Sequence, residues 1–96
     1  MVSVPQLLVH ERRDNVGVVV VEGLKAGTDM TCVVTADNSS FNLTVNDDVP
    51  IGHKVALADL KAGDTAIKYG EDIGRIVADV ARGGHVHVHN LKTKRW

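Results

Sequence analysis

The chain has 96 residues, the size of one small domain, and a domain of this size buries only about 60–65% of its unfolded surface. A partner or a second copy would therefore help it to fold. Its 11 Lys and Arg residues nearly balance 12 Asp and Glu residues, so the net charge of −1 favours neither nucleic acid nor an anionic membrane as a partner. Because we find no long apolar run and no charged-then-apolar leader, we expect a cytoplasmic protein without a membrane segment.

Aromatic residues make up only 3% of the chain, so the core is expected to be aliphatic and rich in valine. The single cysteine, Cys32, excludes an internal disulfide and is typical of a reducing compartment. Within its strand-like segment, Cys32 is expected to be a small buried hydrophobe. Linkers and low-complexity segments are absent, which predicts a single domain over residues 1–96.

The first half of the chain predicts short strands. A short apolar stretch at residues 7–9 leads into a charged loop, and the valine-rich run 16–21 favours a buried strand over a helix. Asp14 and Asn15, just before that run, are expected to cap the loop. Residues 30–34 and 41–45 predict two strands, and the segment between them has turn chemistry, which makes the pair a hairpin.

A short pattern recurs at residues 23–27, 59–63 and 79–83: an apolar residue, two small or basic residues, then glycine. The glycine is expected to supply a positive φ at a turn, a conformation that residues with a Cβ disfavour. Three copies predict three corners between strands. Residues 50–60 could form the only short helix or a further strand. The predicted fold class is therefore mainly β, with tight glycine turns.

Three of the five histidines alternate with valine near the end of the chain. If this run is a strand, His85, His87 and His89 face one way, and Val86 and Val88 enter the core. Same-face neighbours on a strand lie about 6.5–7 Å apart, whereas metal–nitrogen bonds measure about 2.0–2.1 Å. Two of the histidines can therefore converge on one ion, but three would be strained. The alternative is a histidine-rich polar face without a ligand.

Four ordered blocks carry a family resemblance: DNVGV at 14–18, DVPIGHKVAL at 48–57, IKYGEDIG at 67–74 and GHVHVHNL at 84–91. Together they resemble the small domain at the N-terminus of the altronate and galactarate dehydratase family. That domain belongs to the SAF group, whose fold is a β-clip. The likeness spans nearly the whole chain, and four blocks in order are far more specific than any one of them.

The resemblance implies a lyase subunit. Longer members join this module to a large catalytic domain and split members do not, so the expected partner is a separate large catalytic subunit. These enzymes remove a proton from C2 of a 2-hydroxy acid and expel hydroxide or sulfite from C3, and a divalent metal stabilises the enediolate. The expected cofactor is Fe²⁺. The size of this chain favours sulfolactate as substrate over a sugar acid of the altronate or galactarate type.

In this family context, His87 and His89 are the predicted metal ligands. His85 and Asn90 are predicted to support them, because a neutral imidazole ligand must be oriented through its other nitrogen. A second class of function is a non-catalytic ligand-binding or assembly module, since SAF-type β-clips also occur in that role.

Two further segments supply predicted catalytic residues. The turn at 50–52 would project His53 and Lys54, with Lys54 contacting a carboxylate or leaving group and His53 giving acid–base help. Tyr69 could donate its hydroxyl to an anion. The alternatives are structural: an exposed lysine beside a capping histidine, and a tyrosine that packs the domain.

The basic segment 91–96 carries the only tryptophan, Trp96. Trp and Arg are favoured anchors at interfaces, so this tail is predicted to dock onto the large subunit or onto a second copy. A disordered end is the alternative. His10 lies among charged residues and is expected to be a surface residue.

Overall fold

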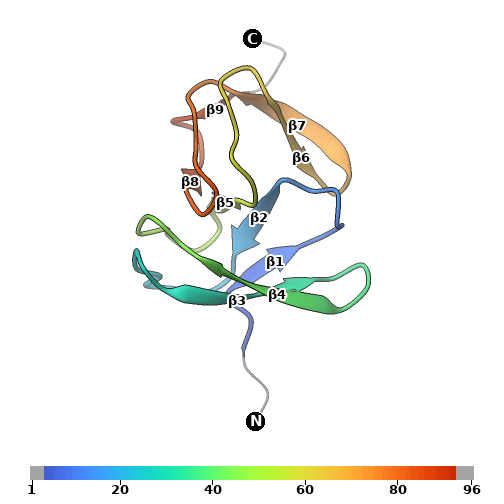
Figure 1. Ribbon diagram of the computed structural model, residues 1–96, viewed down its shortest axis with the longest axis vertical. Coiled ribbons are helices and arrows are strands. Elements are labelled where there is room, and N and C mark those ends of the chain that lie inside the picture. The colour runs from blue at the N-terminus through green and yellow to red at the C-terminus, as the bar shows by residue number, and fades with distance from the viewer. Residues whose placement is uncertain (1–3, 93–96) are drawn as a thin grey trace.

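The computed structural model describes residues 4–92, and every regular element within this range is a strand (Figure 1). The strands are β1 (Leu7–Val9), β2 (Val16–Val19), β3 (Asp29–Val34), β4 (Ser39–Thr44), β5 (Lys54–Ala56), β6 (Thr65–Lys68), β7 (Glu71–Ile76), β8 (His85–Val86) and β9 (Leu91–Lys92). The predicted fold class is confirmed. Residues 50–60 form a turn and β5, so the strand alternative holds there and the helix does not.

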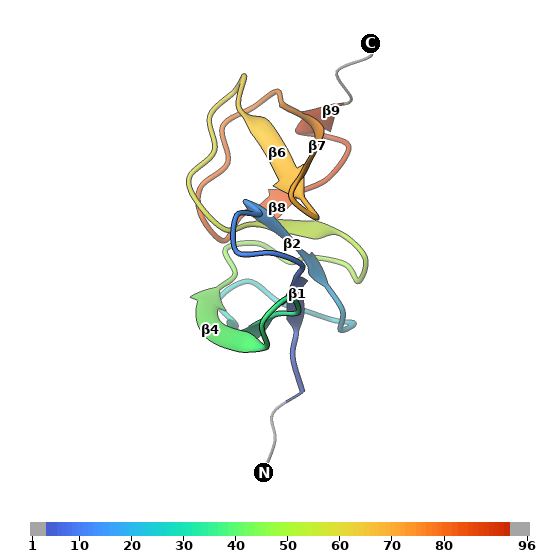
Figure 2. The same cartoon turned by 90° about the vertical axis from the view of Figure 1, so that its right-hand side faces the viewer.

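Two sheets build the domain. The larger has the order β4-β3-β1-β2-β5-β8, and the smaller has the order β6-β7-β9. Neighbouring strands are antiparallel except β1 and β3, which are parallel. Figure 1 and Figure 2 both place the small sheet at one end of the molecule and the hairpin strand β4 toward the other, with β2 and β8 between them. The predicted hairpin is the pair β3–β4.

The core is aliphatic, as predicted, and consists of two clusters. The larger contains Leu7, Val9, Val19, Leu24, Met30, Cys32, Val34, Leu43, Val45, Val49 and Val55. The smaller contains Val16, Ala56, Leu60, Ala66, Ile76, Val80 and Val86. Successive side chains of a strand point to opposite faces, so Val55 enters the larger cluster and Ala56 the smaller. Strand β5, which lies next to the edge strand β8, thus contributes side chains to both cores.

The predicted glycine turns are present. Gly27, Gly63 and Gly83 end the three copies with φ values of 88°, 99° and 89°. A fourth copy, residues 48–52, ends at Gly52 with a φ of 86°. At Gly83 a Cβ would also lie 2.4 Å from the carbonyl oxygen of Thr44, so the glycine is required by close approach as well as by conformation.

The four turns associate in two pairs. Leu24 bridges Val49, and Leu60 bridges Val80, each in antiparallel fashion. Carboxylates of the turns accept backbone N–H bonds from the partner turn: Asp48 from Ala26, Asp79 from Ala62 and Asp59 from Arg82. The members that end at Gly52 and Gly83 lead directly into β5 and β8. This pairing therefore fixes where β5, which follows His53, and β8, which starts at His85, begin.

The histidine run differs from the prediction. Only His85–Val86 is strand, and residues 87–90 form a turn in which the N–H groups of Asn90 and Leu91 both donate to the carbonyl oxygen of His87. Val88 is 66% exposed and does not enter the core. The predicted alternation over the whole run is wrong, because the turn ends the strand after Val86.

Other expectations can be compared with the described residues. Cys32 is buried and unpaired, and His10 is exposed, as expected. No described residue belongs to a helix long and apolar enough to span a membrane. Leu91 and Lys92 pair with β7, whereas residues 93–96, including Trp96, lie outside the described range, so the docking tail stays a prediction.

Candidate functional site

Four histidines gather where β5 and β8 lie side by side. In the register of this antiparallel pair, Val55 faces His85 and Lys54 faces Val86. One step further along this register, His53 comes opposite His87. The pairing therefore joins His53 to the C-terminal histidine run, although 32 residues separate His53 from His85. We call His53, His85, His87 and His89 the histidine cluster.

The rings of the cluster meet in two ways. Those of His53 and His87 stack with centroids 3.5 Å apart and planes inclined by 10°. Nδ1 of His53 and Nε2 of His85 lie 2.7 Å apart. The centroid of His89 is 4.8 Å from that of His85, with the ring planes inclined by 48°. His53 and His85 thus turn ring nitrogens toward each other, while His53 and His87 share ring faces.

The backbone of the cluster is held by two polar side chains. Asp47 accepts the N–H of His85 at 2.9 Å. Asn90, only 6% exposed, accepts the N–H of His87 at 3.0 Å and donates its amide to the carbonyl of His85 at 2.9 Å. Asn90 therefore supports the histidines through their backbone rather than through an imidazole nitrogen. Asp47 was not singled out by the sequence, because its role depends on the approach of β8.

The electrostatics favour neutral rings at His85 and His87. Burial lowers the pKa of His85 below the usual histidine value, and the neighbouring His89 and His53 lower it further. Burial, then His53 and the ammonium of Lys54, lower the pKa of His87. A neutral imidazole keeps a lone pair that can bind a cation or accept a proton. Lys54, half-buried on β5, supplies the adjacent positive charge.

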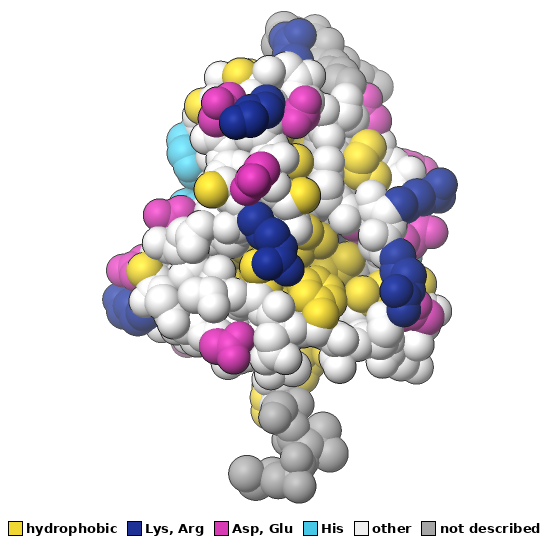
Figure 3. Space-filling view, viewed as in Figure 1, with side chains coloured by type: hydrophobic (Ala, Val, Ile, Leu, Met, Phe, Trp, Pro, Cys, Tyr) yellow, Lys and Arg dark blue, Asp and Glu magenta, His cyan; other side chains and the backbone are white. Residues whose placement is uncertain are grey.

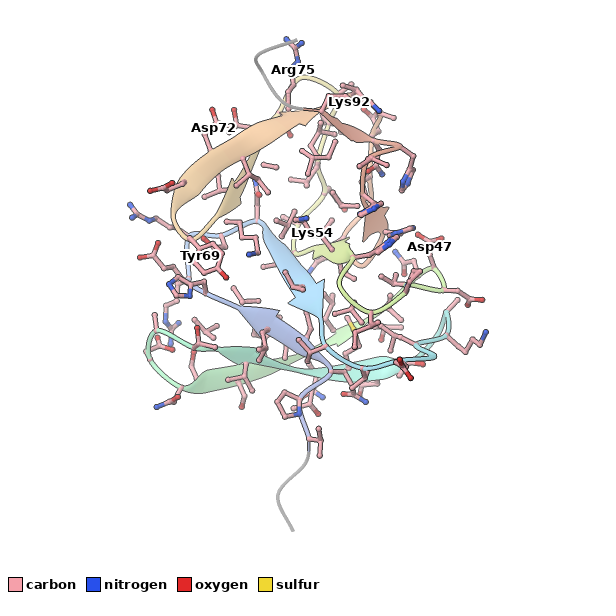
Figure 4. The ribbon with its side chains drawn as sticks, turned by 180° about the vertical axis from the view of Figure 1, so that it is seen from behind. Asp47, Lys54, Tyr69, Asp72, Arg75 and Lys92 are labelled. Carbon is pink, nitrogen blue, oxygen red and sulfur yellow. The ribbon has the colours of Figure 1, made fainter. Side chains whose placement is uncertain are left out.

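Tyr69 lies elsewhere. Figure 4 shows Tyr69 and Asp47 on opposite sides of the molecule, and Asp47 belongs to the histidine side. Tyr69 is in the turn between β6 and β7 with a φ of 58° and is 54% exposed. Its ring contacts that of His10 at 4.2 Å, and the Lys68 ammonium lies 3.7 Å from its centroid. Of the three predicted catalytic residues, only His53 and Lys54 adjoin the C-terminal histidines.

A shallow groove adjoins Tyr69. Its volume is about 220 Å³, and its lining includes Leu8, Val18, Val20, Thr35 and Lys68. The turn that carries Tyr69 is fixed by Asp14, whose carboxylate accepts the N–H groups of residues 11, 69 and 70. Asn15 bonds the backbone of Thr65 and Ile67. Capping of the loop is confirmed for Asp14, which also fixes the β6–β7 hairpin, whereas the side chain of Asn15 bonds β6 instead of the loop.

The residues present fit part of a metal site. Imidazole nitrogens are common ligands of first-row divalent metals, and one nitrogen of His53 and one of His85 lie only 2.7 Å apart. Among residues 4–92, no group of three His, Cys, Asp or Glu side chains has the arrangement of a complete site. Further ligands would have to come from water, substrate or another chain. Figure 3 shows histidine at one edge of a face on which acidic and basic side chains are interspersed.

Comparison with known proteins defines the class. The family model of the altronate/galactarate dehydratase SAF domain matches residues 5–94, so the chain belongs to this family. The chain is 70% identical over 67 residues to (2R)-sulfolactate sulfo-lyase subunit alpha of Paracoccus pantotrophus, covering 70% of this chain and 100% of that protein. It is 52% identical over 89 residues to the protein of the same name from Chromohalobacter salexigens, covering 93% and 95% of the two chains.

A longer relative is also similar. Altronate dehydratase of Escherichia coli is 45% identical over 80 residues, which are 83% of this chain but 15% of that protein. The SAF module is thus a small part of the longer enzyme and nearly the whole of the two alpha subunits. These relatives are lyase subunits or dehydratases by name, which agrees with the family expected from the four sequence blocks.

Proposed function

We propose that this chain is the small subunit of a (2R)-sulfolactate sulfo-lyase, which converts sulfolactate to pyruvate and sulfite. The observation that carries the proposal is the 70% identity to a protein named as the alpha subunit of that enzyme, over the whole length of that protein. The second alpha subunit supports it with 52% identity over 95% of its own length. The subunit would act in the cytoplasm, a location with which the unpaired Cys32 is consistent.

A separate large subunit would complete the enzyme. The relatives are named alpha subunits, which implies a further subunit in those proteins, and the longer altronate dehydratase extends far beyond the matched segment. The histidine cluster would form one wall of the active site, and the large subunit would supply the others. This arrangement predicts that the isolated chain has no lyase activity.

The reaction would be a β-elimination. A base removes the C2 proton, the C3–sulfur bond breaks with its electron pair going to sulfite, and the resulting enol tautomerises to pyruvate. A bound divalent cation, which we propose to be Fe²⁺, would stabilise the negative charge that develops on the substrate carboxylate. The histidine cluster is the proposed holding site for that ion on this chain, with His87 and His89 as the ligands predicted from the sequence.

The remaining roles follow from position. Lys54 would attract the carboxylate or sulfonate, because its ammonium lies close enough to His87 to lower the pKa of that ring. His53 would take up or release a proton when it is not engaged with a cation. Asn90 would hold the histidine turn in place. Tyr69 would reach substrate only if the large subunit brought it there, since it lies on the far side from the cluster.

A second candidate is the small subunit of a sugar-acid dehydratase. The 45% identity to altronate dehydratase favours it, and the chemistry differs only in the group expelled from C3. A non-catalytic SAF module is the third candidate, and it predicts binding without turnover. The three differ in what a reconstituted complex does to sulfolactate and to sugar acids.

The test is reconstitution. The chain is co-expressed with the product of the neighbouring gene, and pyruvate and sulfite are measured from (2R)-sulfolactate with and without Fe²⁺; altronate and galactarate are assayed in parallel. We expect the complex to release sulfite from sulfolactate, and we expect neither chain to do so by itself. Release of 2-oxo sugar acids instead would support the dehydratase, and no turnover of any substrate by a stable complex would leave only the binding module.

A further inference from the structure

The contact between His53 and His85 differs from every other contact in the histidine cluster, because two ring nitrogens face each other within 2.7 Å. We propose that Nδ1 of His53 and Nε2 of His85 are the two ligands that this chain gives to a first-row divalent transition metal. The inference names the metal ligands of the proposed lyase subunit, and in this sense it rests on that function.

Bond lengths support the assignment. An ion bound at about 2.0–2.1 Å to two imidazole nitrogens keeps them roughly 3 Å apart when the two bonds meet near a right angle. The observed separation is 2.7 Å, and the ring centroids lie 5.0 Å apart with planes inclined by 22°, so the two nitrogens meet nearly head-on rather than at a right angle. For their lone pairs to meet at one ion, both rings would turn about their side-chain torsions.

The backbone positions of both ligands are fixed before any ion arrives. His53 follows the Gly52 turn, donates its N–H to the carbonyl of Pro50 and accepts the N–H of Val19. His85 begins β8, where Asp47 accepts its N–H and the Asn90 amide donates to its carbonyl. Preorganised ligands lose little conformational freedom on binding a metal, which favours affinity.

The ligand set also selects the class of metal. Two imidazoles suit Fe²⁺, Co²⁺, Ni²⁺, Cu²⁺ and Zn²⁺, whereas Mg²⁺ and Ca²⁺ prefer oxygen ligands. No third side chain among the described residues completes the site, so the other coordination positions are left for substrate or a second chain. His89 and Val88 are exposed beside the pair, and this is the side from which such ligands would approach.

His87 serves differently in this assignment. The sequence predicted His87 and His89 as ligands on the premise that both lie on one strand face, but both lie in the turn after β8. The His87 ring lies flat against His53, with planes inclined by 10°. The lone pair that an imidazole nitrogen donates to a metal lies in the plane of its ring. Two stacked rings therefore cannot both direct a lone pair at an ion between them. His87 therefore positions the His53 ring and does not share its ion.

The experiment is a Zn²⁺ titration of the full chain, followed by long-range ¹H–¹⁵N NMR of the imidazole nitrogens. We expect the resonances of His53 Nδ1 and His85 Nε2 to shift on binding. The variants His53→Phe and His85→Phe should each weaken binding at least about tenfold. Phenylalanine keeps the ring stacking but has no ligand atom, and far-UV circular dichroism checks that both variants are folded.

The matched control is His10→Phe, which changes an exposed histidine beside Tyr69 and should leave Zn²⁺ affinity unchanged. His87→Phe should reduce affinity by less than about threefold, because it preserves the stacked ring. The assignment is overturned if His53→Phe binds as the original chain does, if other nitrogens respond, or if the chain shows no binding up to about 1 mM Zn²⁺. In that last case the contact is an N–H···N hydrogen bond only.

The titration uses neither substrate nor partner, so its outcome is separable from the proposed lyase function. If the chain binds Zn²⁺ through both nitrogens but no complex containing it turns over substrate, the proposed lyase function fails and the assignment of the two metal ligands stands. If a complex that carries His53→Phe releases sulfite and retains its full metal content, the lyase function stands and the ligand assignment fails.

Discussion

The histidine cluster and the Tyr69 turn are two polar regions built by the same device. In each, a buried or nearly buried side chain bonds backbone groups: Asn90 in the first and Asp14 in the second. They differ in what the held side chains face. The cluster turns ring nitrogens toward one another, whereas the Tyr69 ring packs between His10 and Lys68.

This difference separates holding residues from residues available for chemistry. The polar atoms of Asp14 and Asn90 are engaged with backbone, so these side chains have structural roles that a ligand could not share without cost. Among the described residues, Nδ1 of His53 and Nε2 of His85 have only each other as hydrogen-bond partner. A bound cation could replace that contact, and no comparable group of facing nitrogens lies beside Tyr69 among the described residues.

The largest effect is expected at Asp14, which is 5% exposed and accepts three backbone N–H groups. Asp14→Ala leaves these donors without their partner and should lower the free energy of unfolding by about 3 kcal/mol. Urea unfolding measures the loss. Asp14→Asn is the matched control and should lose less, because its amide oxygen still accepts a hydrogen bond.

The same variant sharpens the comparison. If the two regions are independent, the imidazole NMR signals of His53 and His85 in folded Asp14→Ala stay as in the original chain. A loss below about 1 kcal/mol would contradict the role assigned to Asp14, and displaced histidine signals would contradict the separation of the regions.

Asn90→Ala should act on the opposite region with a smaller effect on stability. It removes the bonds to His87 N–H and to the His85 carbonyl, at a cost of about 1–2 kcal/mol. Because the turn then loosens, the NOE between the His53 and His87 rings should weaken. Asn90→Asp keeps the acceptor for His87 and should preserve more of the NOE; equal NOEs in all three proteins would show that Asn90 does not organise the cluster.

The sequence predicts local features of this fold well. The glycine turns and the β3–β4 hairpin follow from φ preferences and turn chemistry within a few residues, and the aliphatic core follows from composition. The fourth turn, residues 48–52, fits the same pattern with Pro50 and Ile51 in place of the small or basic residues. That it pairs with the turn at 23–27 could be recognised only once Leu24 and Val49 were seen to bridge.

Long-range features could not be derived in this way. The stacking of His53 on His87 depends on the pairing of β5 with β8, and no local period reveals which strands pair. Val88 was misplaced because His-Val alternation continues in sequence past the point where the Asn90 side chain stabilises a turn. The position of Tyr69 was likewise set by Asp14, which is 55 residues away.

The smallest expected effect is a pH dependence of stability in the metal-free chain. The pKa values of His85 and His87 are lowered in the folded state, chiefly by burial, so the unfolded chain binds more protons near the ordinary histidine pKa. The contribution of these two groups to the free energy of unfolding is therefore fully present above a pH of about 6.5. It is lost as the pH falls through and below that value. Urea unfolding at successive pH values measures the slope.

The double variant His85→Gln and His87→Gln tests the origin of this slope, because glutamine keeps a polar side chain that does not titrate. We expect the variant to lose less stability than the original chain as the pH falls below about 6.5. Imidazole C–H signals should give titration midpoints for His85 and His87 below the ordinary histidine value. If the pH dependence of the unfolding free energy is unchanged in the variant, the groups that cause it lie outside the histidine cluster. The expected difference between the two polar regions in their response to protons would then be contradicted.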